Sequence, residues 1–319
     1  MPSKINFSLT QIEYVLAVHK HGHFAKAAAA CYVTQPTLSM QIQKLEEELG
    51  AVIFDRSKKP ILLTEVGKNI IDQLQIILNE AKKVDGLIKI SLHSSLKGEL
   101  IIGVIPTIAP YLLPLLLPVI EKKYPELQLQ IFELQTEEII KSLNNDEIDV
   151  GLLALPLKIS KIFEFPLYFE PFSVLCKKNH EMAKFKKVEY SKLKFNDIWL
   201  LEEGHCLRHQ VMDVCALAES KIKKRKFKFE SGSLETLKNL VNSYGGYTLV
   251  PELAIDSIGD NSSLIHFERP IPSRQIGLVY RREHYKNELI EALGASIIQS
   301  LPEHIQKLRQ KDLDIIPID

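Results

Sequence analysis

The sequence has no excess of charge of either sign, and its first residues include no long apolar run. Among its 319 residues, Lys and Arg number 40 and Asp and Glu also number 40, so any polyanion must be bound by a local surface. The N-terminal stretch lacks an apolar run of signal-peptide length, which predicts a cytoplasmic protein. In that compartment the four cysteines should be thiols, and a disulfide framework is excluded as the default.

Nucleotide-binding and metal-binding motifs are absent as well. The sequence contains no P-loop and no glycine-rich nucleotide fingerprint, and no CxxC spacing supports a zinc site. We therefore expect no cofactor, no metal and no enzymatic activity. A zinc site built from Cys206, Cys215 and a histidine remains an alternative.

One long apolar run needs a separate interpretation. Residues 100–120 carry no charge and are long enough to span a bilayer. They also contain four prolines, which would remove hydrogen bonds that hydrocarbon cannot replace. The run therefore predicts a buried strand over residues 100–105, a turn and a helix packed on a sheet, with no membrane partner.

The first 65 residues have the pattern of a winged helix-turn-helix. Residues 7–20 carry apolar side chains at helical spacing, and residues 24–30 form a short alanine-rich helix. Thr34 is a favourable N-cap before a helix that ends at Gly50. Two helices joined by a tight turn suit DNA binding, and residues 53–63 around Pro60 read as a basic wing.

A long amphipathic helix follows from Thr64. Its apolar positions are spaced 4, 3, 4, 3, 4, a heptad seam that predicts pairing with a second copy of the chain: Ile70, Leu74, Ile77, Ala81, Val84 and Ile88. The alternative is a helix that packs only on its own domain. Residues 93–98 then predict a hinge.

Beyond the hinge, β-rich runs alternate with helical ones. The expected strands are residues 100–105, 127–134, 148–155, 172–178, 248–251 and 275–280, and the expected helices are residues 110–122 and 234–243. Such alternation predicts an α/β region with mostly parallel strands. About 220 residues are enough for two α/β subdomains with a cleft between them.

The first 70 residues resemble the DNA-binding head of LysR-type transcriptional regulators. The family pattern runs through Ala27-Ala28, Thr34-Gln35-Pro36, Ser39, Ile42, Leu45-Glu46, Leu49-Gly50, Ile53-Phe54, Arg56, Thr64 and Gly67. Val66 is a small departure, because alanine is usual there. The resemblance implies a winged helix-turn-helix over 1–65, a linker helix and hinge over 66–97, and a periplasmic-binding-protein-like regulatory domain over 98–319. Its first subdomain would comprise about 98–169 and 270–319, and its second about 170–269.

Within this family, the regulatory domain resembles that of the peroxide-sensing members. The resemblance rests on residues 105–114, 135–136, 204–208 with 215, 233–237, 274 and 276–280. It implies that Cys206 is the peroxidatic cysteine and Cys215 the resolving one. It also implies a peroxide pocket formed by Thr107, Thr136, His205, Arg208 and Arg274. His209 stands where an acidic residue is expected, and this departure puts part of a proton relay in question.

The residues around Cys206 support this chemistry independently. Cys206 follows a Glu-Glu-Gly stretch and precedes an amphipathic run, so it should lie near a helix N-terminus, which favours a thiolate. Arg208 would add a positive charge. Nine residues of helix rise about 13.5 Å, whereas a disulfide needs Cα atoms within about 7 Å. A Cys206–Cys215 disulfide would therefore require residues 204–220 to refold, changing oligomer geometry and promoter binding.

The remaining candidate residues fall into three groups. Cys31 and Cys176 are expected to be structural, and the basic run over residues 221–228 is expected to be a solvated loop and strand edge. The side chains aimed at DNA bases are Gln35, Thr37, Ser39 and Gln43, beside Thr34 and Pro36 at the start of the helix. Arg56, Lys58 and Lys59 would contact phosphates or the minor groove, and such a head would bind as a symmetric dimer or tetramer.

Three functions stay in competition. The first is a transcription regulator that responds to hydrogen peroxide through the two cysteines, with RNA polymerase and a glutaredoxin- or thioredoxin-type reductant as further partners. The second keeps the DNA-binding head but binds a small organic anion in the cleft. The third is a thiol peroxidase, which would leave the head and the linker helix unexplained.

Overall fold

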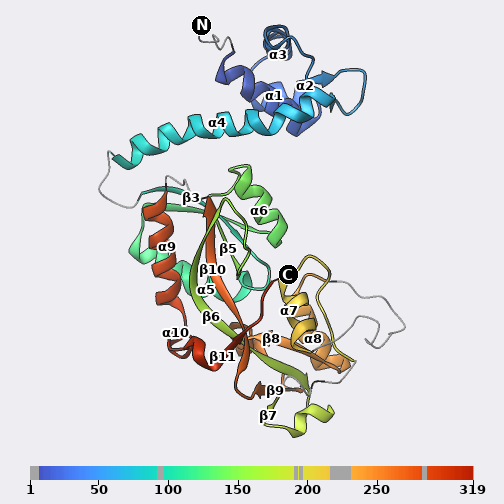
Figure 1. Ribbon diagram of the computed structural model, residues 1–319, viewed down its shortest axis with the longest axis vertical. Helices are drawn as coiled ribbons and strands as arrows, with labels where there is room; N and C mark the ends of the chain where they lie inside the picture. The colour runs from blue at the N-terminus through green and yellow to red at the C-terminus, as the bar shows by residue number, and fades with distance from the viewer. Residues whose placement is uncertain are drawn as a thin grey trace. The chain divides into compact units, whose positions relative to one another are not determined.

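The computed structural model describes residues 7–91, 97–189, 193, 197–215, 231–281 and 286–318. It divides into two compact units, Met1–Ser94 and Ser95–Asp319. Figure 1 shows that the first unit consists of helices and a two-stranded hairpin. The second unit consists of strands with helices around them.

The first unit begins with three short helices whose ends are set by local capping. They are α1 (Leu9–His21), α2 (Phe24–Ala30) and α3 (Gln35–Leu49). Ser8 caps α1 in a capping box, and the Thr34 hydroxyl accepts from the backbone N–H of Thr37 at the start of α3. Gly22 and Gly50 end α1 and α3 in the left-handed conformation. The predicted helix-turn-helix is therefore confirmed; α2 and α3 have the predicted bounds, whereas α1 spans Leu9–His21 instead of residues 7–20.

The predicted wing is a hairpin that the third helix holds in place. Strands β1 (Phe54–Asp55) and β2 (Leu62–Leu63) pair in antiparallel fashion. Glu46 of α3 is buried and accepts from the backbone N–H groups of Ile53 and Phe54, at 2.7 and 3.3 Å. A buried carboxylate with two such donors is well satisfied, so it fixes where the wing leaves the helices.

The linker helix α4 (Glu65–Ser91) begins inside the head. Ile71, Leu74 and Leu78 are buried in the core that α1, α2 and α3 build, and Ile70 and Ile77 pack partly against it. The first half of the predicted seam is therefore covered by its own chain, with Ala81 half-buried. Val84 and Ile88, and most of the predicted hinge, lie outside the described side chains. Pairing through this helix stays a prediction.

The second unit contains the rest of the secondary structure. Its strands are β3 (Gly98–Val104), β4 (Leu127–Glu133), β5 (Val150–Leu155), β6 (Ile162–Lys177), β7 (Lys187–Val188), β8 (Tyr247–Pro251), β9 (Ser262–Phe267), β10 (Ile271–Arg281) and β11 (Leu313–Ile315). Its helices are α5 (Ala109–Lys123), α6 (Thr136–Asn144), α7 (Cys206–Val214), α8 (Leu234–Tyr244), α9 (Asn287–Ser300) and α10 (Glu303–Gln306). The apolar run over residues 100–120 is a strand, a turn and a helix, as predicted.

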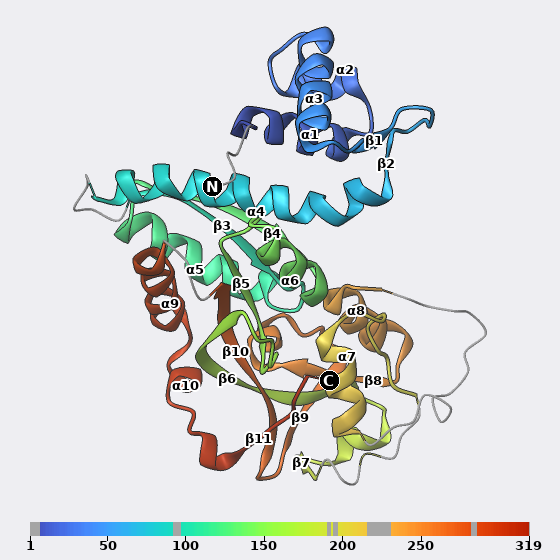
Figure 2. The same ribbon diagram turned by 45° about the horizontal axis from the view of Figure 1, so that its top comes forward.

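Two long strands join two halves of this unit. The order is β4-β3-β5-β10-β6-β9-β7, with β8 also paired to β6 and β11 to β10. The expectation of mostly parallel strands is wrong, because β10 is antiparallel to β5 and β6, and β6 is antiparallel to β8 and β9. The reason is visible in Figures 1 and 2: β6 carries the chain from the first half to the second, and β10 runs beside it in the opposite direction.

Each half has its own hydrophobic core. The first surrounds β3, β5 and β10 with α5 and α9, and contains Leu112, Leu152 and Ile290. The second surrounds β6 and β8 with α7 and α8, and contains Trp199, Val211 and Leu249. Within the described residues, no helix combines the length and hydrophobicity needed to cross a membrane.

Candidate functional site

Cys206 is the first residue of α7 and lies against the first residue of α6. His205 is the N-cap, and Gly204 before it adopts a φ of +90°, a conformation that a side chain would strain. The thiol is 7% exposed, and its Sγ lies 2.8 Å from the Thr136 Oγ1. Two helix N-termini from different halves of the unit therefore meet at one sulfur atom, where their dipoles favour negative charge.

Burial and polar contacts oppose each other at this thiol. Burial raises the pKa of Cys206, while the Thr136 hydroxyl, the Arg274 charge and the backbone lower it, and the net pKa lies above the ordinary value. The cation that acts on the thiol is therefore Arg274, which the family resemblance placed in the pocket, whereas the neighbouring residues alone pointed to Arg208. The Arg208 guanidinium donates instead to the carbonyl oxygen of Leu201, at 2.7 Å. That bond ties α7 to the chain segment before it.

Arg274 is completely buried and is held on three sides. Glu170 Oε2 accepts from its Nε at 2.8 Å and forms a 2.7 Å ion pair with its NH2. Thr107 accepts from the same guanidinium through its hydroxyl at 2.8 Å and through its carbonyl at 3.1 Å. Glu170 also accepts from the backbone N–H of Leu253. Such a network holds the Arg274 cation in a fixed position, from which its charge acts on the Cys206 thiol.

Cys215 closes the same helix at the opposite end. It is 2% exposed in the second core, and the Tyr247 hydroxyl donates to its Sγ at 4.0 Å. Burial raises the pKa of Cys215 to about 12. Both cysteines are free thiols. An intervening helix of nine residues rises about 13.5 Å, so they cannot bond while α7 persists.

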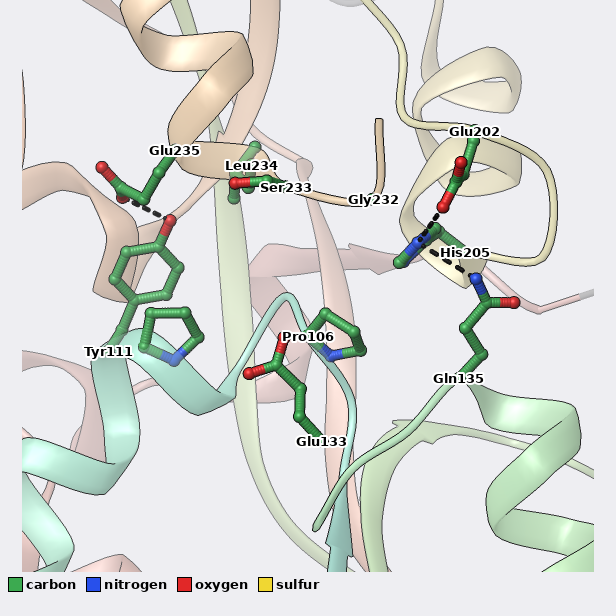
Figure 3. A pocket seen from close by; sticks show the side chains of 11 residues that line it. Pro106, Tyr111, Glu133, Gln135, Glu202, His205, Gly232, Ser233, Leu234 and Glu235 are labelled. Atoms are coloured by element: carbon green, nitrogen blue, oxygen red, sulfur yellow. Dashed lines mark hydrogen bonds and ion pairs between the residues drawn. The ribbon is translucent and has the colours of Figure 1, made fainter. Parts of the chain in front are cut away.

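A cleft lies on the other side of the contact between Thr136 and Cys206. Its cavity of about 230 Å³ is lined by Pro106, Pro110, Tyr111, Glu133, Gln135, Glu202, His205, Gly232, Ser233, Leu234 and Glu235. Figure 3 shows Gln135 and Glu202 converging on the buried His205 ring, with Nε2 distances of 3.4 Å to Gln135 Nε2 and 3.6 Å to Glu202 Oε1. The cleft thus borders the Thr136–Cys206 contact through Gln135 and His205, the residues that precede them in the chain.

Two family models match the chain, one for each unit. Residues 9–68 match the bacterial regulatory helix-turn-helix protein, lysR family, and residues 93–302 match the LysR substrate binding domain. The "DNA-binding transcriptional dual regulator OxyR" of Escherichia coli is 34% identical over 303 residues, covering 94% of this chain and 98% of the relative. The chain belongs to the OxyR group of the LysR family.

Other OxyR-type proteins match over similar lengths. The "Hydrogen peroxide-inducible genes activator" of Dickeya chrysanthemi is 34% identical, over 94% of this chain and 98% of the relative. Full-length OxyR of Pseudomonas aeruginosa superimposes with a TM-score of 0.74 and 33% identity, covering 92% and 98% of the two chains. A hydrogen-peroxide-bound OxyR variant of Corynebacterium glutamicum gives a TM-score of 0.61 and 30% identity, covering 93% and 94%.

The structure of this OxyR-type chain brings four of the five predicted pocket residues together. Thr107, Thr136, His205 and Arg274 are all buried around the start of α7. Arg208 is half-buried and engages Leu201, as described above. His209 is exposed on α7, so the departure from the family pattern falls on the outer side of that helix.

The predicted DNA-contacting residues lie at the start of α3 and in the wing. Thr34, Gln35, Pro36, Thr37 and Gln43 are exposed, and Ser39 is half-buried. The exposed Gln43 amide donates to Glu47, at 3.1 Å, within the helix.

The wing residues differ in how they are held. Lys58 and Lys59 are exposed at the hairpin tip. Arg56 also has partners within the head, because its NH2 pairs with the buried Glu46 at 2.8 Å and its guanidinium lies 5.3 Å from the Phe24 ring centre.

Several functional candidates escaped the sequence analysis. Tyr32 is 95% exposed in the turn before α3, and Met40 on that helix is 60% exposed; an aromatic in a turn beside a recognition helix was a usable signal. Glu170 and Tyr247 offered no such signal. Strand pairing brings Glu170 to Arg274, and packing in the second core brings Tyr247 to Cys215.

The other cysteines have structural surroundings. Cys176 is completely buried in the second core, and burial raises its pKa to about 11. Cys31 ends α2 and is half-buried. In the part of the chain that the structure describes, no three His, Cys, Asp or Glu side chains form a group able to hold a metal. Residues 221–228 lie outside the described residues.

Proposed function

We propose that this protein is a DNA-binding transcription regulator that responds to hydrogen peroxide through Cys206 and Cys215. The observation that carries the proposal is the Thr136–Cys206 contact near Arg274, with the second thiol at the far end of the same helix. The curated relatives that carry the peroxide description match along nearly the whole chain.

The first step is oxidation of Cys206 by peroxide. The thiolate attacks one peroxide oxygen, an S–O bond forms and the O–O bond breaks. The distal oxygen leaves as hydroxide and takes up a proton to become water. Thr107, Thr136 and Arg274 are suited to stabilise the charge on the sulfur and on the leaving oxygen. His205, beside the sulfur, is suited to carry the proton.

The second step joins the two cysteines. Cys215 attacks the Cys206 sulfur, an S–S bond replaces the S–O bond, and a second water leaves. Because α7 separates the thiols, this step requires the helix to unwind, and the region from residue 204 to 220 refolds. Residues 216–220 lie outside the described residues. A two-electron dithiol reductant of the glutaredoxin or thioredoxin type would reverse the reaction.

The refolded segment would alter how copies of the chain assemble on DNA. We assign residues 1–65 to the winged head, 66–97 to a dimerising linker, and 98–319 to the sensor, with the two subdomains divided as predicted. Thr34, Gln35, Pro36, Thr37, Ser39 and Gln43 would face the major groove, and Lys58 with Arg56 the backbone. A homodimer or homotetramer would present two or more heads, and RNA polymerase is the natural downstream partner of such a regulator.

The cleft chemistry disfavours the organic-anion alternative. Three carboxylates, from Glu133, Glu202 and Glu235, line the cavity, and no lysine or arginine belongs to its described lining. An anion would lie near these carboxylates, and the buried Lys238 is already paired with Glu235 at 2.7 Å, so a further negative charge there is costly. A thiol peroxidase would use the same first step but gives no role to the head.

The direct test is peptide mapping after about one equivalent of hydrogen peroxide is added to the reduced protein. Trypsin cuts after Arg208, so Cys206 and Cys215 fall on separate peptides. We expect one disulfide-linked pair of these peptides, together with altered promoter binding in a gel-shift assay. Cys215→Ser should stop at the sulfenic acid, and Cys206→Ser should abolish both responses.

Cys176→Ser serves as the matched control, because it removes a thiol from the second core while keeping the proposed pair. Its disulfide yield should equal that of the unaltered protein. If Cys206→Ser kept the promoter response, the cysteine switch would be wrong. Sustained peroxide consumption with a reductant, without a change in DNA binding, would favour the peroxidase.

A further inference from the structure

A second cavity lies beside β6, β9, β10 and α10, and it shares no lining residue with the cleft. Its volume is about 330 Å³, larger than that of the cleft. The described lining comprises Pro171, Phe172, Ser173, Lys187, Glu252, His266, Phe267, Ile271, His304 and Leu308. None of these residues belongs to the redox site. The volume falls within the range of small-molecule sites in proteins.

The floor of this cavity is apolar and buried. Phe172 and Phe267 are 1% and 2% exposed and belong to the second core. Leu308 packs against the first core, and Ile271 against the second. A ligand on this floor would therefore contact both halves of the unit, and it would bury apolar surface at about 25 cal/mol per Å².

One wall carries two nitrogen-bearing side chains. Lys187 and His266 are register partners in the parallel pair of β7 with β9, and both are exposed. Ser173 lies 3.1 Å from His266 Nδ1 through its hydroxyl, which orients the ring. With Ser173 donating to Nδ1, the Nε2 carries the proton and can donate to an oxygen ligand.

The opposite wall holds one carboxylate that is already paired. Glu252 Oε1 lies 3.2 Å from His304 Nε2, and both residues line the cavity. The described lining thus combines one lysine, two histidines and one paired glutamate. The formal charges of Lys187 and Glu252 cancel, whereas the cleft lining has three glutamates and one histidine, so this cavity is the less negative of the two.

We propose that this second cavity binds a small aromatic monocarboxylate. The ring would lie on Phe172 and Phe267, and the carboxylate would face Lys187 and His266. Aromatic rings stack on such a floor in offset or edge-to-face contacts. Lys187 supplies a positive charge for the carboxylate, whereas the described lining of the cleft contains no lysine or arginine. The site is separate from peroxide chemistry and does not depend on the proposed cysteine switch.

Binding there would be able to modulate the sensor. The ligand touches β6 and β10, the strands that join the two halves, and it contacts residues of both cores. A ligand that prefers one arrangement of the halves shifts the population toward it, and the coupling is reciprocal. The effect would be read as a change in ligand affinity between the reduced and the oxidised protein.

The test uses 2-naphthoate as the probe, titrated into the full-length reduced protein by calorimetry. We expect saturable binding, at least tenfold weaker binding of the neutral 2-naphthamide, and at least fivefold weaker binding to Lys187→Ala. Leu308→Trp should fill the cavity and abolish binding, provided its circular dichroism matches that of the unaltered protein. Lys187→Ala changes an exposed side chain, so it remains informative if the tryptophan variant fails to fold.

Glu133→Gln in the cleft is the matched control and should change naphthoate affinity by less than twofold. Affinity that follows the cleft variant instead of Lys187→Ala would overturn the assignment. Equal binding of the acid and the amide would overturn the role of charge, and no saturable binding at millimolar probe would overturn the site. The peroxide response is measured separately by peptide mapping, so failure of either idea leaves the other intact.

Discussion

At the scale of single residues, the sensor depends on the few groups that set the charge on Cys206. The sulfur is buried, which favours the neutral thiol, while Thr136 and Arg274 favour the thiolate. Because Arg274 is paired with Glu170 and Thr107, its position is fixed before any peroxide arrives. The polar groups therefore moderate a desolvation penalty that they do not fully cancel.

Thr136→Val tests this balance, because valine keeps the shape and removes the hydroxyl. Loss of the 2.8 Å contact should raise the pKa of Cys206 further and slow sulfenic acid formation about tenfold at neutral pH, a change of about 1.4 kcal/mol in the barrier. Stopped-flow measurement with excess peroxide reports the rate. His209→Asp, on the exposed side of α7, is the control and should stay within twofold.

The pH dependence of the oxidation rate follows from the direction in which the pKa of Cys206 is shifted. The pKa of Cys206 is raised, so the reactive thiolate is scarce at neutral pH and increases as the pH rises. The rate of sulfenic acid formation should still be climbing as the pH passes about 8.5, the ordinary thiol value. A plateau already reached at pH 7 would mean that the thiol is activated more strongly than its surroundings indicate.

Tyr168 offers a stability prediction. Its hydroxyl is buried, and no described protein group forms a hydrogen bond with it. Tyr168→Phe removes an unsatisfied polar atom and should raise the free energy of unfolding by about 1 kcal/mol. The melting temperature should increase by about 2–4 °C. An unchanged or lower melting temperature would show that the hydroxyl is satisfied in solution.

At the scale of elements, α7 is the part whose stability decides the second step. It holds Cys206 in the redox pocket at one end and Cys215 in the second core at the other. The helix can be lost only if Cys215, Val211 and their neighbours leave that core. The equilibrium between helix and disulfide therefore depends on packing as well as on the cysteines.

Two variants at the exposed His209, His209→Gly and His209→Ala, isolate the effect of helix stability on disulfide formation. Glycine in a helix interior is about 1 kcal/mol less favourable than alanine. His209→Gly should speed conversion of the sulfenic acid to the disulfide about fivefold relative to His209→Ala. The first oxidation step should be the same in both. Quenched-flow trapping of the sulfenic acid measures the two steps, and equal conversion rates would place the barrier elsewhere.

At the scale of the whole molecule, a chain without net charge must bind DNA through local surfaces. The head offers an exposed α3 start and a basic wing, but Arg56 is already paired with Glu46. DNA affinity would then come from exposed groups such as Lys58. Each head bound to a symmetric half-site would contribute its own set of these contacts.

Lys58→Ala and Arg56→Ala should separate these roles. Lys58→Ala should weaken binding to all DNA sequences and lower the salt dependence by about one unit of log–log slope for each contacting head. Arg56→Ala leaves the buried Glu46 without its 2.8 Å partner and should lower the melting temperature of the head. Fluorescence anisotropy at several salt concentrations and thermal denaturation distinguish them; identical effects would contradict the assignment.

The sequence by itself determined what depends on near neighbours. Capping by Thr34, the glycine end of α3 at Gly50, and the proline-rich strand–turn–helix over residues 100–120 were all predicted correctly. These features rest on hydrogen bonds and steric limits that act within a few residues. The start of α7 at Cys206 belongs to the same class, as does the impossibility of a disulfide across it.

Only the tertiary structure decided which distant groups meet. It placed the Arg274 charge, rather than that of Arg208, where it acts on the thiol. It brought Glu170 to Arg274 through the pairing of their strands, and it buried Leu74 in the core of the head. It also gave the two cavities different charge, with three glutamates in the lining of the cleft and one lysine with one glutamate in the lining of the second cavity. Such contacts depend on strand pairing and on which faces pack, and electrostatic effects follow distance in space, so residues far apart in the chain control the sulfur.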